Sequence, residues 1–345
     1  MATHPVQPAT TLPTRPLGLG GPEVTTAGFG AWALGGGDWS FSWGPQDDEQ
    51  SIAAILHAVD LGVTWIDTAS VYGHGHSEEV VGRALERIPP AQRPLVFTKC
   101  GLVWDAAHPH VPARRDLRPD TIRRHCDESL RRLGVDVLDL LQFHWPDETG
   151  TPVEESWGTM LELVAAGKVR AGGVSNFDVG LLERCEALGH VTSLQPPFSL
   201  VNRRAAADVL PWCSAHGTGV IVYSPMQSGL LTGAFSAERV DALAPDDWRR
   251  RAEDFREPAL SRNLALVDAL RPVADRRGVS VAALAVAWAI AFAEVSGAIV
   301  GARSPAQVDG WIGAVSVDLD AEEMREIAGA IERTGAGEGP DLPVG

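Results

Sequence analysis

Several residue types are scarce in this sequence, and each shortage excludes a class of protein. The 345 residues include only four cysteines, which lie far apart without a C-x-x-C pair, so a reducing cytoplasm is indicated rather than a disulfide framework. Lysine and arginine number 29 against 45 aspartates and glutamates, and the net charge of −16 argues against nucleic acid or an anionic membrane as a partner. The longest apolar run, around residues 281–292, is too short to span a bilayer. We therefore expect a cytoplasmic protein that binds neither membranes nor nucleic acid.

Hydrophobic residues make up 45% of the chain, which is enough for a large buried core. Residues 1–16 lack the apolar stretch of a secretion signal and are predicted to form a disordered tail. A second tail is predicted for residues 334–345. Residues 17–333 contain no linker rich in proline, glycine and serine, so they are expected to form a single domain.

Between the two tails, short apolar runs alternate with segments of helical period. The apolar runs are residues 26–34, 64–67, 95–99, 137–144, 169–175, 192–195, 219–224 and 297–301. The helical segments are residues 48–61, 77–88, 118–133, 153–166, 179–188, 203–216, 281–292, 305–312 and 321–332. This alternation predicts an α/β fold with a parallel sheet, and eight strand–helix units predict a (β/α)8 TIM barrel. Two insertions, residues 102–117 and 226–260, follow strands and should lie on the catalytic face of the barrel.

An open, doubly wound sheet is the competing architecture, because a G-x-G-x-x-A pattern runs from Gly28 to Ala33. A dinucleotide-binding turn of this kind should open a helix, whereas residues 34–38 are mostly glycine. We interpret these glycines instead as allowing the end of a strand to approach a ligand closely.

Titratable side chains follow three consecutive predicted strands. Asp67 ends one strand and Tyr72 lies in the loop after it, Lys99 ends the next strand, and His144 ends the third. Each residue alone has an ordinary structural explanation, such as a cap or a solvated side chain. Because the carboxyl ends of barrel strands meet on one face, the four together favour a shared site.

The four side chains form a chemically coherent set. The pKa of tyrosine, about 10 in water, is high for a proton donor at neutral pH. The ammonium of Lys99 should lower the pKa of Tyr72, and Asp67 should hold Lys99 in place. A neutral His144 could donate a hydrogen bond to a carbonyl oxygen and orient it toward Tyr72. Such a site protonates an oxygen that is becoming an alkoxide, which implies hydride delivery from a nicotinamide cofactor.

Three long motifs add a family resemblance. They are G-x-x-x-x-D-T-A-x-x-Y-G from Gly62, residues 133–140 leading into His144, and residues 167–170 with 173–177. Their order and spacing are similar to the signatures of the aldo-keto reductase family, from about Arg15 to Glu332, and closest to a bacterial, general-stress-protein-like subgroup. The resemblance implies the (β/α)8 fold and a catalytic tetrad of Asp67, Tyr72, Lys99 and His144, with Tyr72 as general acid.

The resemblance also implies how a nicotinamide dinucleotide would bind. Ser175, Asn176 and Gln195 would bond the carboxamide, Tyr223 would stack on the ring, and the loop of residues 226–231 would hold the pyrophosphate. Further contacts are expected at Ala31, Trp32, Ser224, Pro225, Met226, Ser228, Gly229, Leu230, Gly301 and Gln307.

Arg303 precedes a predicted helix N-terminus, with Ser304 as the expected N-cap and Pro305 after it. A fork-shaped positive charge at this place suits a 2′-phosphate, so the expected cofactor is NADP(H). Gly301 and Trp311 depart from the family, in which lysine and an adenine-binding asparagine are usual at these positions.

The expected substrate is a small carbonyl compound or a sugar, in a pocket formed by Trp32, Trp104 and Trp145. Reduction is the expected direction, although oxidation of the corresponding alcohol remains open. No metal site is expected, because two H-x-H pairs offer only two ligands each. Two alternatives stay open: a cofactor-binding regulatory subunit with slow turnover, and an aldolase that forms a Schiff base on Lys99. A homo-oligomer is also possible.

Overall fold

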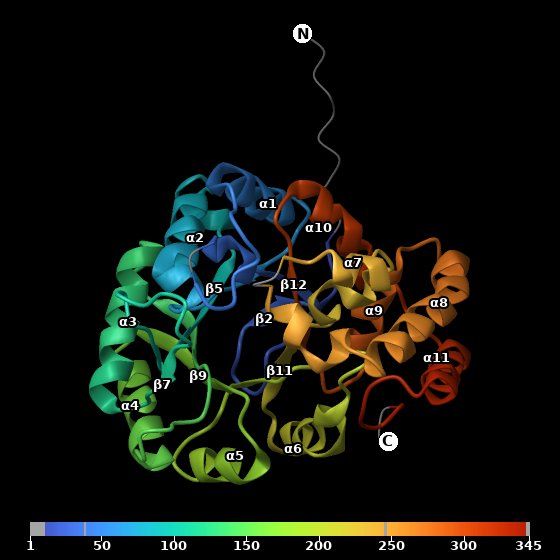
Figure 1. Ribbon diagram of the computed structural model, residues 1–345. Helices are drawn as coiled ribbons and strands as arrows, with labels where there is room; N and C mark the ends of the chain where they lie inside the picture. Colours follow the sequence, from blue (N-terminus) through green and yellow to red (C-terminus); the bar gives the residue numbers. More distant parts are fainter. Residues whose placement is uncertain (1–10, 38, 245–246, 343–345) are drawn as a thin grey trace.

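The computed structural model describes residues 11–37, 39–244 and 247–342, and its centre is a closed barrel of parallel strands (Figure 1). In barrel order the strands are β3 (Ala27–Gly30), β4 (Trp65–Asp67), β5 (Leu95–Cys100), β8 (Leu138–Phe143), β9 (Val169–Ser175), β10 (Ser193–Gln195), β11 (Gly219–Val222) and β12 (Gly297–Gly301). The last strand, β12, pairs with β3 and closes the barrel. The predicted (β/α)8 fold is therefore confirmed, and the doubly wound alternative is wrong.

Helices surround the barrel in a ring (Figure 1). They are α1 (Asp48–Asp60), α2 (His76–Glu86), α3 (Pro119–Leu133), α4 (Val153–Ala165), α5 (Val179–Glu186), α6 (Val209–His216), α9 (Val281–Ile290) and α10 (Pro305–Ile312). Two further helices, α8 (Ala259–Arg277) and α11 (Ala321–Thr334), pack against each other. Along the described residues, no helix has the length and apolar character needed to cross a membrane.

Local sequence signals explain where several helices begin. Asp47 caps α1 by accepting a hydrogen bond from the backbone N–H of Gln50 at 2.8 Å. Helix α11 begins with a capping box, in which Asp320 and Glu323 each accept a backbone N–H of the other. The prediction missed α8, which has Pro272 in its interior, a residue that usually ends or kinks a helix.

The interior of the barrel is filled from several strands and from an N-terminal hairpin. Strands β1 (Thr14–Pro16) and β2 (Glu23–Thr25) pair antiparallel, and Leu17 and Val24 from this hairpin join the interior cluster around Trp65 and Phe97. The predicted tail, residues 1–16, therefore extends too far, because Thr14–Pro16 forms a strand.

The second predicted tail is held in place over residues 336–341 by Arg203. Its guanidinium, only 3% exposed, donates hydrogen bonds to the carbonyls of Ala336, Gly339 and Pro340 and pairs with Asp341 at 2.8 Å. A buried guanidinium needs such acceptors. The sequence of residues 336–341 gives no sign that their carbonyl groups would fill this role. Residues 1–10 and 343–345 of the predicted tails lie outside the described residues.

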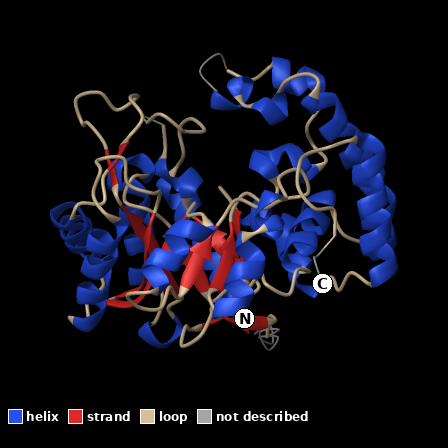
Figure 2. Cartoon of the chain, turned by 90° about the horizontal axis from the view of Figure 1, so that it is seen from below, coloured by secondary structure: helices blue, strands red, loops and turns tan. Residues whose placement is uncertain are grey.

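Both insertions lie beyond the C-terminal ends of strands, as expected. The first forms a hairpin of β6 (Leu102–Val103) and β7 (Arg114–Arg115). The second contains short helices: η5 (Gln227–Thr232), α7 (Ala237–Asp241), η6 (Trp248–Arg251) and η7 (Glu253–Phe255). Figure 2 shows these loops above the strands, with the N-terminal hairpin at the opposite end.

Gly28 serves packing inside the barrel rather than ligand approach. A Cβ atom on Gly28 would lie 2.1 Å from the fully buried indole of Trp65. The interpretation of Gly28 as a ligand contact is therefore wrong, whereas Gly30 at the end of the same strand does line the cavity described below.

We expect Gly28→Ala to lower the free energy of unfolding by about 1–3 kcal/mol, because the added methyl group must displace a closely packed indole. Urea unfolding measures the change. The matched control is Gly158→Ala in α4, where an added Cβ would contact nothing within 4 Å. This control should gain up to about 1 kcal/mol from helix propensity. Equal stability of the two variants would contradict the packing role of Gly28.

Candidate active site

A cavity of about 920 Å³ opens at the C-terminal end of the barrel. Trp65 and Phe97 belong to the interior layer. Because side chains alternate along a strand, Asp67 and Lys99, two residues further on, point inward as well. His144 follows β8 on its inward-facing side and lines the cavity together with Asp67. The period of two along each strand thus places these polar groups on one face.

Lys99 is the centre of the site. Its ammonium Nζ donates to Asp67 Oδ1 at 2.5 Å, to the Thr68 carbonyl at 2.9 Å and to the Tyr72 hydroxyl at 3.2 Å. The second carboxylate oxygen of Asp67 accepts a hydrogen bond from Gln195 Nε2 at 2.9 Å. Lys99 is completely buried and Asp67 is 3% exposed, so each charge depends on the other.

The structure brings all four members of the predicted tetrad together. The rings of Tyr72 and His144 meet edge-on, with their centroids 5.7 Å apart. Burial, and then the charge of Lys99, lower the pKa of His144 well below its usual range, so the imidazole is neutral near pH 7. Both rings line the cavity, whereas Lys99 lies behind them.

The expected lowering of the tyrosine pKa is wrong. Burial and the negative charge of Asp67 raise the pKa of Tyr72 well above its ordinary value of 10.0. Asp67 offsets the charge of Lys99, so the ammonium does not bring the pKa of Tyr72 below its ordinary value. Tyr72 therefore carries its proton throughout the neutral range and is available as a donor.

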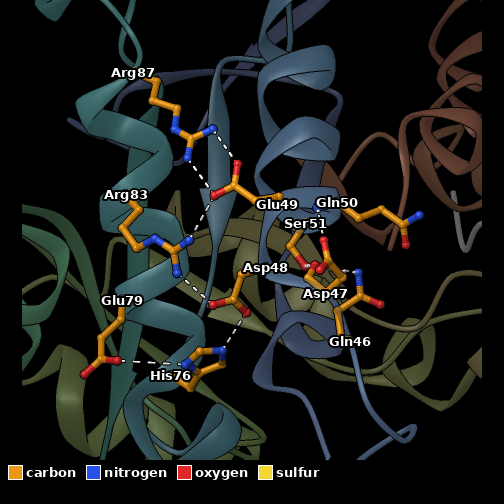
Figure 3. Close-up of polar contacts among 10 residues, drawn as sticks. All are labelled: Gln46, Asp47, Asp48, Glu49, Gln50, Ser51, His76, Glu79, Arg83 and Arg87. Carbon is orange, nitrogen blue, oxygen red and sulfur yellow. Dashed lines mark hydrogen bonds and ion pairs between the residues drawn. The ribbon is translucent and has the colours of Figure 1, made fainter.

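Helix α2, which follows the Tyr72 segment directly, is anchored to α1 by a polar network (Figure 3). Asp48 accepts from His76 at 2.8 Å and from Arg83 at 2.7 Å, and Glu49 pairs with Arg87 at 2.8 Å. The hydrogen bonds from His76 and Arg83 outweigh burial and lower the pKa of Asp48. This network fixes the start of α2 and, with it, the end of the loop that carries Tyr72.

A second group of polar side chains lies beside the tetrad. Asn176 donates from Nδ2 to the His144 carbonyl and to Ser175 Oγ, both at 3.0 Å, and accepts from the Tyr223 hydroxyl at 2.9 Å. Ser175, Asn176, Gln195 and Tyr223 all line the cavity. Amide and hydroxyl groups next to an aromatic ring fit a flat ring that bears a carboxamide, as in nicotinamide.

The loop after β11 has the backbone geometry of an anion cradle. Ser224, Gln227 and Ser228 have positive φ angles of 57°, 44° and 53°, and Gly229 has 94°. Left-handed residues of this kind can turn successive N–H groups toward one concavity, which suits a pyrophosphate. The cavity lining includes the predicted Ser224, Pro225, Met226, Ser228 and Gly229.

Two predicted cofactor contacts lie elsewhere. Leu230 is completely buried in a separate apolar cluster with Phe235 and Phe255, because the loop turns it away from the cavity. Ala31 is also completely buried, and its carbonyl accepts a hydrogen bond from Ser77 Oγ at 2.8 Å. Neither residue lines the cavity.

Arg303 lies at the far end of the cavity, together with Gly301, Gln307 and Trp311. Its guanidinium donates to Gln46 Oε1 and to the Pro45 carbonyl, both at 2.5 Å. Ser304 is the N-cap residue of α10, as predicted, but its side chain makes no capping hydrogen bond. The end of the cavity therefore combines a positive charge with a helix N-terminus.

The aromatic lining differs in part from the prediction. Trp32 lines the cavity and stacks between Tyr72 and Trp248, at ring-centroid distances of 6.3 and 6.0 Å, and Trp145 also lines it. Trp104 does not line the cavity, because its indole stacks on His74 at 5.4 Å instead.

Sequence reasoning missed several lining residues: Trp39, Phe41, Arg115 and Arg239. Trp39 and Phe41 follow a glycine-rich stretch after a strand, which is the signal that could have indicated them. Within the described residues, no group of three or more histidine, cysteine, aspartate or glutamate side chains could hold a metal ion.

Fold and site together define a (β/α)8 barrel with a buried lysine–carboxylate pair and a tyrosine at the carboxyl ends of its strands, and the comparisons specify the family. A profile of the Aldo/keto reductase family matches residues 27–332, so the chain belongs to this family. It is 35% identical to the aldo-keto reductase YhdN of Bacillus subtilis (strain 168) over 91% of this chain and 92% of the relative. It is 33% identical to the NADH-specific methylglyoxal reductase of Escherichia coli (strain K12), over 92% and 99% of the two chains.

Among solved structures, the glycerol dehydrogenase AKR11B4 from Gluconobacter oxydans is similar over 97% of this chain and 98% of its own, with 36% identity and a TM-score of 0.85. The aldo-keto reductase Tm1743 has 26% identity and a TM-score of 0.70, over 92% of this chain and all of its own. These likenesses agree with the barrel and with its assignment to the family.

We expect Asp67→Asn to lower the free energy of unfolding by about 3–5 kcal/mol, because the buried ammonium of Lys99 loses its counter-ion. Urea unfolding at neutral pH measures this loss. The control is Asp309→Asn, which removes a 61% exposed carboxylate that contacts His57 at 2.7 Å. An exposed pair of this kind should contribute at most about 1 kcal/mol. Losses of similar size in the two variants would show that the buried pair is not structurally required.

Proposed function

We propose that this protein is an NADPH-dependent reductase of aldehydes and ketones, with Tyr72 as the proton donor, and that it also oxidises the corresponding alcohols or sugars. The observation that carries the proposal is the contact of the Tyr72 hydroxyl with Lys99 Nζ at 3.2 Å inside a cavity that His144 also lines. Membership of a family with reductase relatives supports the same activity. The free, buried thiols of all four cysteines agree with work in the cytoplasm.

Each member of the tetrad has a separate task in this reaction. A bound nicotinamide would supply the hydride that adds to the carbonyl carbon. His144, which is neutral and lines the cavity, donates a hydrogen bond that orients the carbonyl oxygen. Tyr72 then transfers its proton to that oxygen as negative charge develops, and Lys99 stabilises the phenolate that remains. Asp67 keeps Lys99 charged and in place.

The geometry gives no support to the Schiff-base alternative. Lys99 Nζ is buried behind Tyr72 and His144 and donates to three oxygen atoms, one of which is a carboxylate oxygen of Asp67 at 2.5 Å. A lysine that forms a Schiff base must be uncharged and must reach its substrate. Lys99 is paired with a carboxylate and has no exposed surface, so it meets neither condition.

Arg303 and the uncapped N-terminus of α10 support NADPH as the cofactor. The Arg303 guanidinium lines the cavity, and exchange of its carbonyl partner for a 2′-phosphate oxygen would gain a charge-assisted hydrogen bond. The E. coli relative is named as NADH-specific, so NADH is the competing cofactor in the tests.

Tyr72→Phe should lower kcat for aldehyde reduction about a hundredfold or more, because it removes the proton donor while it keeps the aromatic ring. The decrease in nicotinamide absorbance with a panel of aldehydes measures turnover, and tryptophan fluorescence measures cofactor binding. Cofactor affinity should remain nearly unchanged.

Two results would contradict the proposal. Loss of cofactor binding in Tyr72→Phe would mean that the site is wrongly assigned. Tight cofactor binding by the unmodified protein, without turnover of any carbonyl compound, would instead indicate a regulatory subunit.

Arg303→Ala should weaken NADPH binding about ten- to a hundredfold, because it removes a hydrogen bond to a charged phosphate, and should weaken NADH binding much less. Fluorescence titration with both cofactors gives the two dissociation constants. Gln46→Ala is the control, since it loosens the same loop contact but keeps the positive charge. Equal weakening of both cofactors in Arg303→Ala would show that Arg303 does not recognise the 2′-phosphate.

A further inference from the structure

The cavity carries the opposite charge to the protein as a whole. Among the described residues, the lining includes four arginines, Arg115, Arg239, Arg249 and Arg303, and one carboxylate, Asp67. Asp67 is already bonded to Lys99 and Gln195, and Arg249 is paired with Asp247 at 2.6 Å. Although the chain has a net charge of −16, the charged side chains among the described lining residues are therefore mostly positive. Such a lining favours anionic ligands.

Three of these arginines lie near the proposed cofactor site. Arg239 and Arg249 belong to the insertion after β11, and Arg303 follows β12. Arg115 belongs to the other insertion, the hairpin after β5, and β5 lies across the barrel from β11. The phosphates of a nicotinamide dinucleotide therefore do not account for Arg115.

Arg115 is held next to the tetrad by an aromatic ring. Its guanidinium carbon lies 4.3 Å from the ring centroid of Trp145, the residue that follows His144. Such a cation–π contact fixes the plane of the guanidinium. Leu102 faces Arg115 across the hairpin and also lines the cavity. An apolar wall thus lies beside the positive charge.

The present partner of Arg115 can be exchanged. Glu148 Oε1 accepts from Arg115 Nη1 at 2.8 Å, but the Glu148 side chain is 59% exposed and that of Arg115 is 34% exposed. Exposed ion pairs contribute little to stability. A guanidinium has five N–H donors, so most of them are available to a second carboxylate.

We propose that Arg115 binds a carboxylate of the substrate, so that the preferred substrates are aldehydes or ketones that carry an acidic group some atoms away from the carbonyl. The planar fork of an arginine matches a carboxylate with two parallel hydrogen bonds. Tyr72 and His144 hold the carbonyl end, Arg115 holds the acidic end, and the apolar wall contacts the carbon chain between them. This inference rests on the proposed reductase activity.

The test uses two aldehydes that carry a carboxylate, succinic semialdehyde and 4-carboxybenzaldehyde. Each is compared with its own methyl ester, which keeps the aldehyde but lacks the negative charge. The unmodified enzyme should show a kcat/KM about tenfold or more higher for each acid than for its ester. Arg115→Gln should remove most of this preference by raising KM for the acids, while kcat and the values for the esters stay nearly unchanged.

Two further variants sharpen the test. Arg114→Gln, at the exposed neighbouring position outside the cavity lining, should behave as the unmodified enzyme. Glu148→Gln should raise kcat/KM for the acids, since it removes the competing carboxylate.

The outcomes separate this inference from the proposed function. Turnover of esters and acids alike, or equal losses for both in Arg115→Gln, would overturn the role of Arg115 and leave the reductase activity established. If no aldehyde is reduced, the proposed function fails, and the site is tested by calorimetric binding of succinate. Weaker succinate binding in Arg115→Gln would support an anion site, and equal binding would overturn it.

Discussion

The buried contact between Lys99 and Asp67 determines both the stability and the chemistry of this barrel. A lysine with no exposed surface remains charged only with a counter-ion, and Asp67 supplies one at 2.5 Å. Asp67 in turn is satisfied by Gln195, so the pair connects β4 and β5 with β10 across the interior. Lys99 and Asp67, which we propose as part of the catalytic tetrad, are therefore also a polar part of the core, and a substitution of either one should affect both stability and activity.

Charge balance around Tyr72 explains how a tyrosine with a raised pKa would act as an acid in the proposed reaction. The Lys99–Asp67 pair has no net charge, His144 is neutral, and burial disfavours the phenolate, so the resting site holds its proton on Tyr72. An alkoxide is more basic than a phenolate and attracts this proton even so. The site thus releases its proton only when negative charge develops on the substrate, which suits hydride transfer to a carbonyl carbon.

Features that depend on strand period could be predicted from the sequence, and those that depend on loop conformation could not. Asp67, Lys99 and His144 could be predicted as site residues because each lies at the end of an apolar run, and the carboxyl ends of parallel barrel strands lie on one face. Trp104 was misplaced because the hairpin after β5 turns its indole onto His74, a contact set by tertiary pairing. Similarly, Leu230 faces a separate apolar cluster although Gly229, directly before it, lines the cavity.

The net charge of the chain likewise does not predict the charge inside the cavity. A net charge of −16 argues against polyanionic partners, but it says nothing about a cavity lined by four arginines. Salt screens exposed charges beyond about 8–10 Å, so the surface carboxylates have little effect on a ligand inside the cavity. There the short-range contacts decide, and they come from the insertions after β5 and β11 and the loop after β12. The ends of the barrel strands thus carry most of the groups of the proposed reaction, and the loops between strand and helix carry the groups that would determine substrate specificity.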